Sequence, residues 1–175
     1  MRLTEKVRQF FLKYRYELLI FIILLIFFAL LEHFQPYFFC QDDNRDQGMP
    51  IHVFNHRSIM KGEIPLINFH QFLGCPNLSN GLSMVLYPPL YVATFISQIF
   101  WGHLQAEIDI LGVMHLIFGG IGFFLMLRIM GVKERAAFLG AIAWPLCSFN
   151  IYVSSAWPVS YTHLRAHETP EPSRM

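Results

Sequence analysis

The sequence contains few charged residues, and their signs nearly balance. Only 14% of its 175 residues are charged, with 13 Lys and Arg against 12 Asp and Glu. A typical soluble domain carries about 25%, so an ordinary soluble fold is disfavoured. The chain also lacks the basic excess that binds nucleic acid, and it contains no Cys-x-x-Cys pair and no Cys/His zinc spacing.

Cysteine is scarce as well, with only Cys40, Cys75 and Cys147. Cys40 and Cys75 fall in one predicted loop. They either form a disulfide, if that loop lies in an oxidising compartment, or stay as two thiols. We favour the two thiols.

Hydrophobic residues, by contrast, make up 54% of the chain and collect in long runs. The 18 Phe residues need lipid or a very large core to cover them. A helix of about 20 apolar residues crosses about 30 Å of hydrocarbon. We therefore predict an all-α integral membrane protein with about four transmembrane helices, over residues 16–35, 84–101, 108–130 and 136–157.

The N-terminal segment, residues 1–15, sets the expected orientation. It carries five cations against one acid, Glu5. No small-residue cleavage site follows the first apolar run, so we interpret that run as an uncleaved helix with a cytoplasmic N-terminus. Four alternating spans would then put Arg128, Lys133 and Arg135 outside, against the positive-inside rule. A re-entrant third segment would remove this conflict.

A large external loop, residues 36–83, is expected between the first and second spans. It is too polar to cross a membrane and too aromatic for a disordered linker. Within it, Met49–Met60 can form an amphipathic helix on the bilayer surface. Beyond it, Pro88-Pro89 suit the first turn of the next helix, whose amides lack intrahelical partners.

The third predicted span has a glycine stripe that suits close helix packing in lipid. We expect His115 to be its only ionisable interruption. The stripe consists of Gly112, Gly119, Gly120 and Gly122.

The last stretch, residues 158–175, differs in composition from everything before it, because the apolar runs stop there. Ser160–Thr169 resembles translated sequencing-adapter read-through. We expect the natural protein to continue past about Trp157, which makes this chain the N-terminal fragment of a larger multi-span protein. The alternative is a genuine short polar tail.

Three carboxylates, Asp42, Asp43 and Asp46, stand within five residues just beyond the first span. Adjacent carboxylates cannot easily both ionise without a cation or water nearby. One of them can gain the raised pKa that a general base needs near neutrality. Such a base could take a proton from an acceptor hydroxyl or bind a divalent metal. Composition alone favours a solvated acidic start of the loop.

The order of several segments carries a family resemblance. After the basic start, the first span and the acidic loop come Lys61–Asn68, Gly74–Pro76, Leu86–Tyr91, His115-Leu116 and Leu127–Ala137. Over about residues 10–156 this order resembles the YfhO family of bacterial membrane proteins. More broadly, it is similar to the GT-C superfamily of multi-span glycosyltransferases.

The resemblance implies a truncated GT-C-like bundle in the bacterial cytoplasmic membrane. Such an enzyme transfers a sugar from a polyprenyl-phosphate donor in the lipid bilayer to an envelope polymer or lipid acceptor outside. It also implies that an Asp of the first external loop acts as base or metal ligand. That role falls on Asp43 or Asp42, with Asp46 as a competitor.

Other polar residues of the loop are candidates for substrate contacts. Arg45, Arg57 and Lys61 either hold the carrier phosphate, since Arg pairs with phosphate oxygens, or meet anionic headgroups. Tyr87 is a candidate substrate contact, or it shapes the helix entrance together with Pro88-Pro89.

Three histidines are candidates for a divalent metal, the only cofactor that the sequence indicates. His52 and His56 stand four residues apart, on one face of a helix. With His70 and the Asp cluster they could bind the ion, or they lie at the lipid headgroups.

The alternative function is that of a non-enzymatic multi-span membrane protein: a transporter, a flippase or an assembly subunit. In that case His115 and the glycine stripe would carry the function, and the Asp cluster would not.

Overall fold

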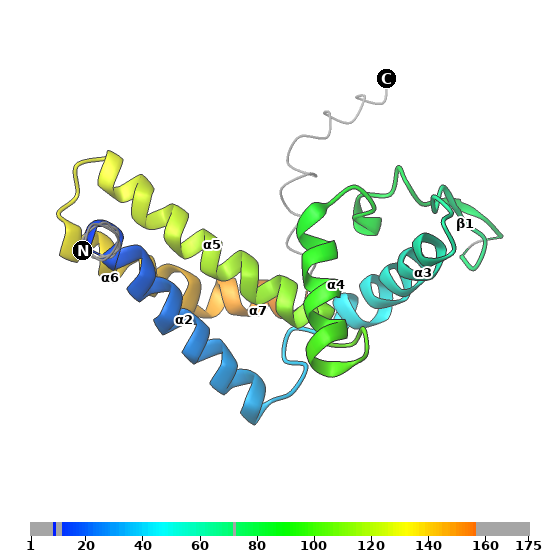
Figure 1. Ribbon diagram of the computed structural model, residues 1–175, viewed down its shortest axis with the longest axis horizontal. Helices are drawn as coiled ribbons and strands as arrows, with labels where there is room; N and C mark the ends of the chain where they lie inside the picture. Colours follow the sequence, from blue (N-terminus) through cyan, green and yellow to red (C-terminus); the bar gives the residue numbers. More distant parts are fainter. Residues whose placement is uncertain (1–8, 10–11, 72, 157–175) are drawn as a thin grey trace, which may run out of the picture. The chain divides into compact units, whose positions relative to one another are not determined.

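The computed structural model describes residues 9, 12–71 and 73–156 of the chain (Figure 1). The chain divides into two compact units. We call them the helical unit, Met1–Phe38 with Val113–Tyr152, and the loop unit, Phe39–Gly112 with Val153–Met175. The elements are α2 (Arg15–Phe34), η1 (Asn44–Gly48), α3 (Met49–Met60), β1 (Ile67–Asn68), β2 (Cys75–Pro76), η2 (Gly81–Ser83), α4 (Pro88–Trp101), α5 (Glu107–Ile129), α6 (Glu134–Leu146) and α7 (Ser148–Ala156).

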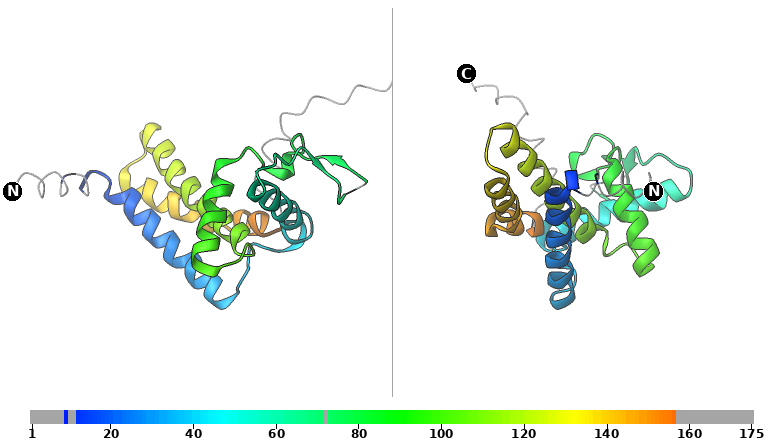
Figure 2. Two further views of the ribbon diagram at one scale, coloured as in Figure 1. Left: turned by 45° about the vertical axis from the view of Figure 1, so that its right-hand side comes forward. Right: turned by 60° about the vertical axis from the view of Figure 1, so that its left-hand side comes forward.

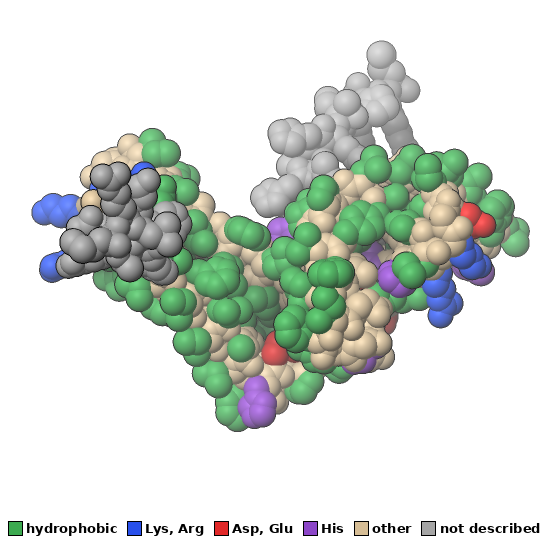
Figure 3. Space-filling model, viewed as in Figure 1, with side chains coloured by type: hydrophobic (Ala, Val, Ile, Leu, Met, Phe, Trp, Pro, Cys, Tyr) green, Lys and Arg blue, Asp and Glu red, His purple; other side chains and the backbone are tan. Residues whose placement is uncertain are grey.

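Three helical stretches in the described part of the chain are long and apolar enough to cross a membrane: Arg15–Phe34, Glu107–Ile129 and Glu134–Ala156. The mostly helical fold is as predicted, and the apolar helices suit a lipid bilayer. Figure 3 shows hydrophobic side chains outnumbering charged ones over α2 and α5. The second predicted span, residues 84–101, forms α4, which has only 14 residues. A helix of that length extends about 21 Å, short of about 30 Å of hydrocarbon.

Helices α2, α5 and α6 lie side by side (Figure 2), and small residues let them pack closely. A Cβ atom added at Gly120 of α5 would lie 3.0 Å from the Ala141 carbonyl oxygen of α6. It would also lie 3.0 Å from Leu24 Cδ1 of α2. Both Leu24 and Ala141 are fully buried. The absence of a side chain at Gly120 therefore allows the three helices to meet.

The rest of the glycine stripe follows the prediction at two positions and departs from it at one. A Cβ atom at Gly112 would lie 3.3 Å from the Phe39 ring, and one at Gly119 would lie 2.5 Å from the Trp144 ring. Gly122 has nothing within 4 Å of its added Cβ atom, so its predicted packing role was wrong.

The start of α2 and the turn between α5 and α6 lie at the same end of the helical unit. Glu134 Oε2 lies 3.2 Å from Arg15 Nη2, and Glu134 Oε1 lies 3.6 Å from Arg128 Nη2. The Tyr16 and Phe124 rings, 6.0 Å apart between centroids, also bring the start of α2 to the later part of α5. Helices α2 and α5 are therefore antiparallel.

This arrangement bears on the charge conflict found in the sequence. Antiparallel α2 and α5 require the connecting chain to leave and return on the same side of the membrane. A single crossing by α4 does not fit that requirement, so the packing does not confirm the prediction of four alternating spans. The turn that carries Arg128, Lys133 and Arg135 lies at the same end of the helical unit as Arg15, an arrangement that agrees with the positive-inside rule.

The fourth apolar run breaks into two helices near its proline. Pro145 stands inside α6, and α6 ends one residue later at Leu146. Cys147 is extended, with a ψ of 141°, before α7 begins at Ser148. Proline lacks the amide that would continue the ladder of hydrogen bonds, which explains a break close to it.

The loop unit contains the helix predicted at Met49–Met60, and α3 has those bounds. Its position on a bilayer stays a prediction. The ladder β1–β2 pairs Ile67 with Pro76 and Asn68 with Cys75. The cations Arg2, Lys6 and Arg8 and the residues of the predicted tail, 158–175, lie outside the described residues.

Candidate functional site

The acidic turn, Asp42–Asp46, leads directly into α3. The turn η1 covers Asn44–Gly48, and α3 begins at Met49 without a break. The carboxylates predicted from the sequence therefore stand at the start of one continuous helical segment, Asn44–Met60, and the predicted cations stand along it.

Asn44 fixes this turn from within. Its side chain is only 4% exposed. Its Nδ2 donates to the Phe39 carbonyl at 2.9 Å, and it also lies 3.0 and 3.1 Å from the Ser154 and Ser155 carbonyls. These two serines lie in the last turn of α7, where helix carbonyls lack intrahelical partners. Asn44 thus donates hydrogen bonds to carbonyl groups at the end of α7 and holds the acidic turn in place.

The three carboxylates have different surroundings. Asp43 is half-buried, and its Oδ1 accepts a hydrogen bond from Gln47 Nε2 at 2.9 Å. Asp42 is exposed, with a positive φ of 48° that Asp tolerates better than most residues. Asp46 is exposed and accepts from Arg45 Nε at 2.8 Å. The hydrogen bond and charge of Arg45 lower the pKa of Asp46 below its ordinary value, so Asp46 is a weaker proton acceptor than the general base predicted here.

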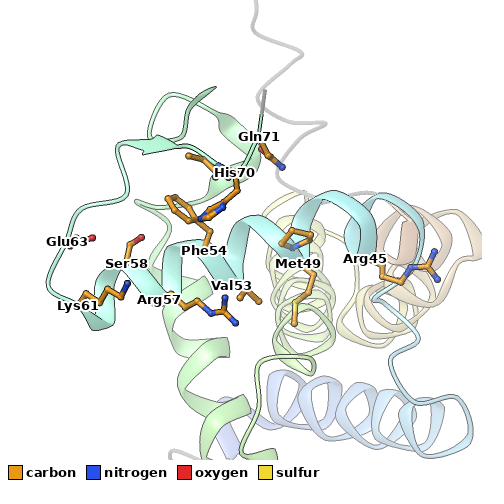
Figure 4. Close-up of a pocket in the computed structure, with 12 residues that line it drawn as sticks. Arg45, Met49, Val53, Phe54, Arg57, Ser58, Lys61, Glu63, His70 and Gln71 are labelled. Carbon is orange, nitrogen blue, oxygen red and sulfur yellow. Dashed lines mark hydrogen bonds between the residues drawn. The ribbon is translucent and has the colours of Figure 1, made fainter. Parts of the chain in front are cut away.

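Three of the four predicted substrate contacts line one groove of about 800 Å³: Arg45, Arg57 and Lys61. Arg57 and Lys61 stand four residues apart at the end of α3, on one helix face. Figure 4 draws Arg45 at the opposite end of the groove from Lys61. A single phosphate can therefore meet Arg57 with Lys61, while Arg45 is already bound to Asp46.

The groove also has an apolar lining. Met49, Val53 and Phe54 come from α3, and the Phe54 ring lies 5.8 Å from the His70 ring in an edge-on arrangement. Glu63 lines the same end as Lys61 (Figure 4). A ligand with an anionic head and an apolar tail fits this combination of cations and hydrocarbon.

The fourth predicted contact, Tyr87, is not among the groove's lining residues. It precedes α4 with an extended backbone, and Pro88 and Pro89 occupy the first helical positions. Burial raises the pKa of the Tyr87 phenol. Its position supports the role of shaping the helix entrance.

The predicted metal site does not assemble. His52 and His56 do lie near one another, against a small cavity, but His70 lines the separate groove. Among the described residues, no three His, Cys, Asp or Glu side chains could hold a metal ion together. We therefore derive no step through a metal. Cys40 and Cys75, both within the described residues, are not joined by a disulfide.

The structure instead pairs His52 with Glu107, the first residue of α5. His52 Nδ1 lies 2.9 Å from Glu107 Oε1, and the side chains are 4% and 1% exposed. The Thr94 hydroxyl lies 2.6 Å from Glu107 Oε2 and 2.9 Å from the Leu90 carbonyl. A hydroxyl has one proton to donate. The Glu107 carboxylate is the better acceptor of the two, because it is charged and closer.

Sequence reasoning missed Glu107 and Asp109. Asp109 is 4% exposed, and its Oδ1 accepts from the Phe39 amide at 2.7 Å. The prediction that only His115 interrupts 108–130 was therefore wrong. The sequence did contain a signal for these two residues, because two acids flank Ile108 where an apolar run begins. Ionisable residues in such a position often have a functional role.

Comparison of the chain with protein-family models, with curated proteins and with solved structures gives no match.

Proposed function

We propose that this chain is the N-terminal part of a membrane glycosyltransferase. It takes a sugar from a polyprenyl-phosphate donor in the bilayer and transfers it to an envelope polymer or lipid acceptor outside the bacterial cytoplasmic membrane. The observation that carries this proposal is the segment Asn44–Met60, which joins the acidic turn to the cationic groove. The resemblance to GT-C enzymes adds to it.

Each group has a chemical role in this proposal. Asp43 or Asp42 takes the proton of the acceptor hydroxyl as the acceptor oxygen bonds to the sugar carbon. The bond between that carbon and the carrier phosphate oxygen breaks, and Arg57 and Lys61 neutralise the phosphate released. Asp46, ionised beside Arg45, orients the guanidinium. Val53 and Phe54 cover the first units of the lipid chain.

The test uses the protein of the complete reading frame in native membranes. Transfer of labelled sugar is measured for the wild type and for Asp42→Asn, Asp43→Asn and the double variant. Loss of a general base lowers the rate by about 10²–10⁴-fold. Glu134→Gln is the matched control, since Glu134 is a half-exposed carboxylate that does not line the groove. Unchanged transfer in both Asp variants would remove these carboxylates from the mechanism.

The alternative is a transporter, flippase or assembly subunit, and one observation favours it. The buried His52–Glu107 pair stands where a candidate span begins, a position typical of ion and proton pathways. If this alternative holds, Glu107→Gln abolishes activity and Asp43→Asn leaves it intact. The opposite pattern supports the transferase.

A further inference from the structure

The His52–Glu107 pair is close but incompletely hydrogen-bonded. Its two atoms lie 2.9 Å apart, yet both His52 nitrogens and Glu107 Oε1 have no aligned hydrogen-bond partner among the described residues. Buried polar groups without a partner cost about 1–3 kcal/mol each, so such groups usually have an internal water or a ligand.

A small cavity lies against these atoms. Its volume is about 40 Å³, and the pair lines it together with Asn55, His56, Tyr91 and Thr94. A water molecule needs at least about 10–15 Å³ of such volume and two to four polar partners. The cavity therefore suits water in both size and chemistry.

Asn55 and Tyr91 cannot replace that water, because their polar atoms are already used. Asn55 Nδ2 donates to the Ser83 carbonyl at 2.6 Å, and Asn55 Oδ1 accepts from Asn77 Nδ2 at 2.7 Å. The Tyr91 hydroxyl donates to the Val85 carbonyl. These bonds leave the cavity-facing atoms of His52 and Glu107 to an outside partner.

A metal ion is the competing occupant, and the ligand set is too small for it. In the part of the chain that the structure describes, no group of three His, Cys, Asp or Glu side chains surrounds one point. Structural zinc takes four ligands, and catalytic zinc takes three from the protein.

We propose that this cavity binds one internal water molecule that bridges His52 and Glu107. The water donates one hydrogen bond to Glu107 Oε1 and forms another with an imidazole nitrogen of His52. It joins α3 to the start of α5 and lets a polar pair stay buried. This site is independent of the proposed transferase activity.

Crystals of the full chain, grown from a lipidic mesophase and diffracting well enough to show ordered water, test the proposal. The expected result is a density peak within hydrogen-bond distance of Glu107 Oε1 and a His52 nitrogen. An empty cavity in a map that shows other buried waters would overturn it. So would a peak about 2.0–2.1 Å from the imidazole nitrogen with anomalous signal, which marks zinc.

A variant pair sharpens this test. His52→Phe with Glu107→Leu removes the polar atoms, and the peak should disappear. The control, Glu63→Gln, changes an exposed carboxylate elsewhere and should keep it. A peak that persists in the double variant would contradict the bridging role. If the double variant does not fold, the wild-type map alone decides.

Discussion

Glu134 Oε2 lies 3.2 Å from Arg15 Nη2. This contact links the start of α2 to the turn before α6 within the helical unit. Both side chains are about half exposed, so the ion pair itself adds little stability. Its value is topological, because it brings two positively charged segments to one end of the helical unit.

The topology predicts a pattern of cysteine labelling. The native cysteines are changed to serine, and single cysteines are then introduced one at a time. The four positions are exposed: Lys13, Lys133, Glu63 and Gln105. A membrane-impermeant maleimide should label Glu63→Cys and Gln105→Cys in intact cells. It should label Lys13→Cys and Lys133→Cys only after permeabilisation. Labelling of positions 63 and 105 from opposite sides would restore α4 as a crossing helix.

The packing of α5 predicts different results for two neighbouring glycines. Gly120→Ala places a methyl group 3.0 Å from the Ala141 carbonyl, so the helices must separate. Overpacking of this kind costs about 1–3 kcal/mol. Gly122→Ala meets no atom within 4 Å and should be neutral or slightly stabilising, since Ala favours helix. Thermal unfolding in detergent measures both, and equal losses would contradict the packing.

The buried pair predicts an energetic coupling. Glu107→Gln leaves the His52 imidazole without its carboxylate and should cost about 1–3 kcal/mol of unfolding free energy, because buried polar groups lose a partner. His52→Phe combined with Glu107→Leu should cost less than the sum of the single changes. A double-mutant cycle of denaturant unfolding measures this coupling. Strict additivity would show that the two side chains do not act together.

The Asn77 side chain predicts a stability effect separate from glycosylation. It is 1% exposed, and its Nδ2 lies 2.7 Å from Asn55 Oδ1 and 2.9 Å from the Pro65 carbonyl. Asn77→Ala should therefore cost about 1–3 kcal/mol by leaving buried partners unsatisfied. Asn77-Leu78-Ser79 fits the glycosylation sequon. Ser79→Ala removes that sequon at an exposed position and should leave unfolding unchanged. Similar losses in both would contradict the network.

Local patterns in the sequence predicted much of the fold. Apolar runs located α2, α5 and α6, and Met49–Met60 matched α3 in its bounds. The structure does not confirm the crossing at 84–101, since hydropathy counts apolar residues and ignores the side from which the chain returns. That information came from Glu134, which meets Arg15 only after folding.

The candidate site was predicted in part for a similar reason. Arg45, Arg57 and Lys61 stand on one segment, so their shared groove follows from helical spacing. The partner of His52 could not be predicted from spacing, because Glu107 is 55 residues away in the sequence and approaches it only through α5 packing. Local reasoning therefore supplied His56 and His70 as neighbours in place of the carboxylate.

The kinetics of sugar transfer by the complete protein test the central claim most directly. The account predicts that Asp43→Asn, combined with Asp42→Asn, lowers kcat by at least about 10²-fold at an unchanged KM for the lipid donor. Arg57→Gln with Lys61→Gln should instead raise the donor KM by about tenfold or more, since a hydrogen bond to a charged group contributes about 1.5–3 kcal/mol. Wild-type kcat and KM in both sets of variants would contradict the assignment of this site.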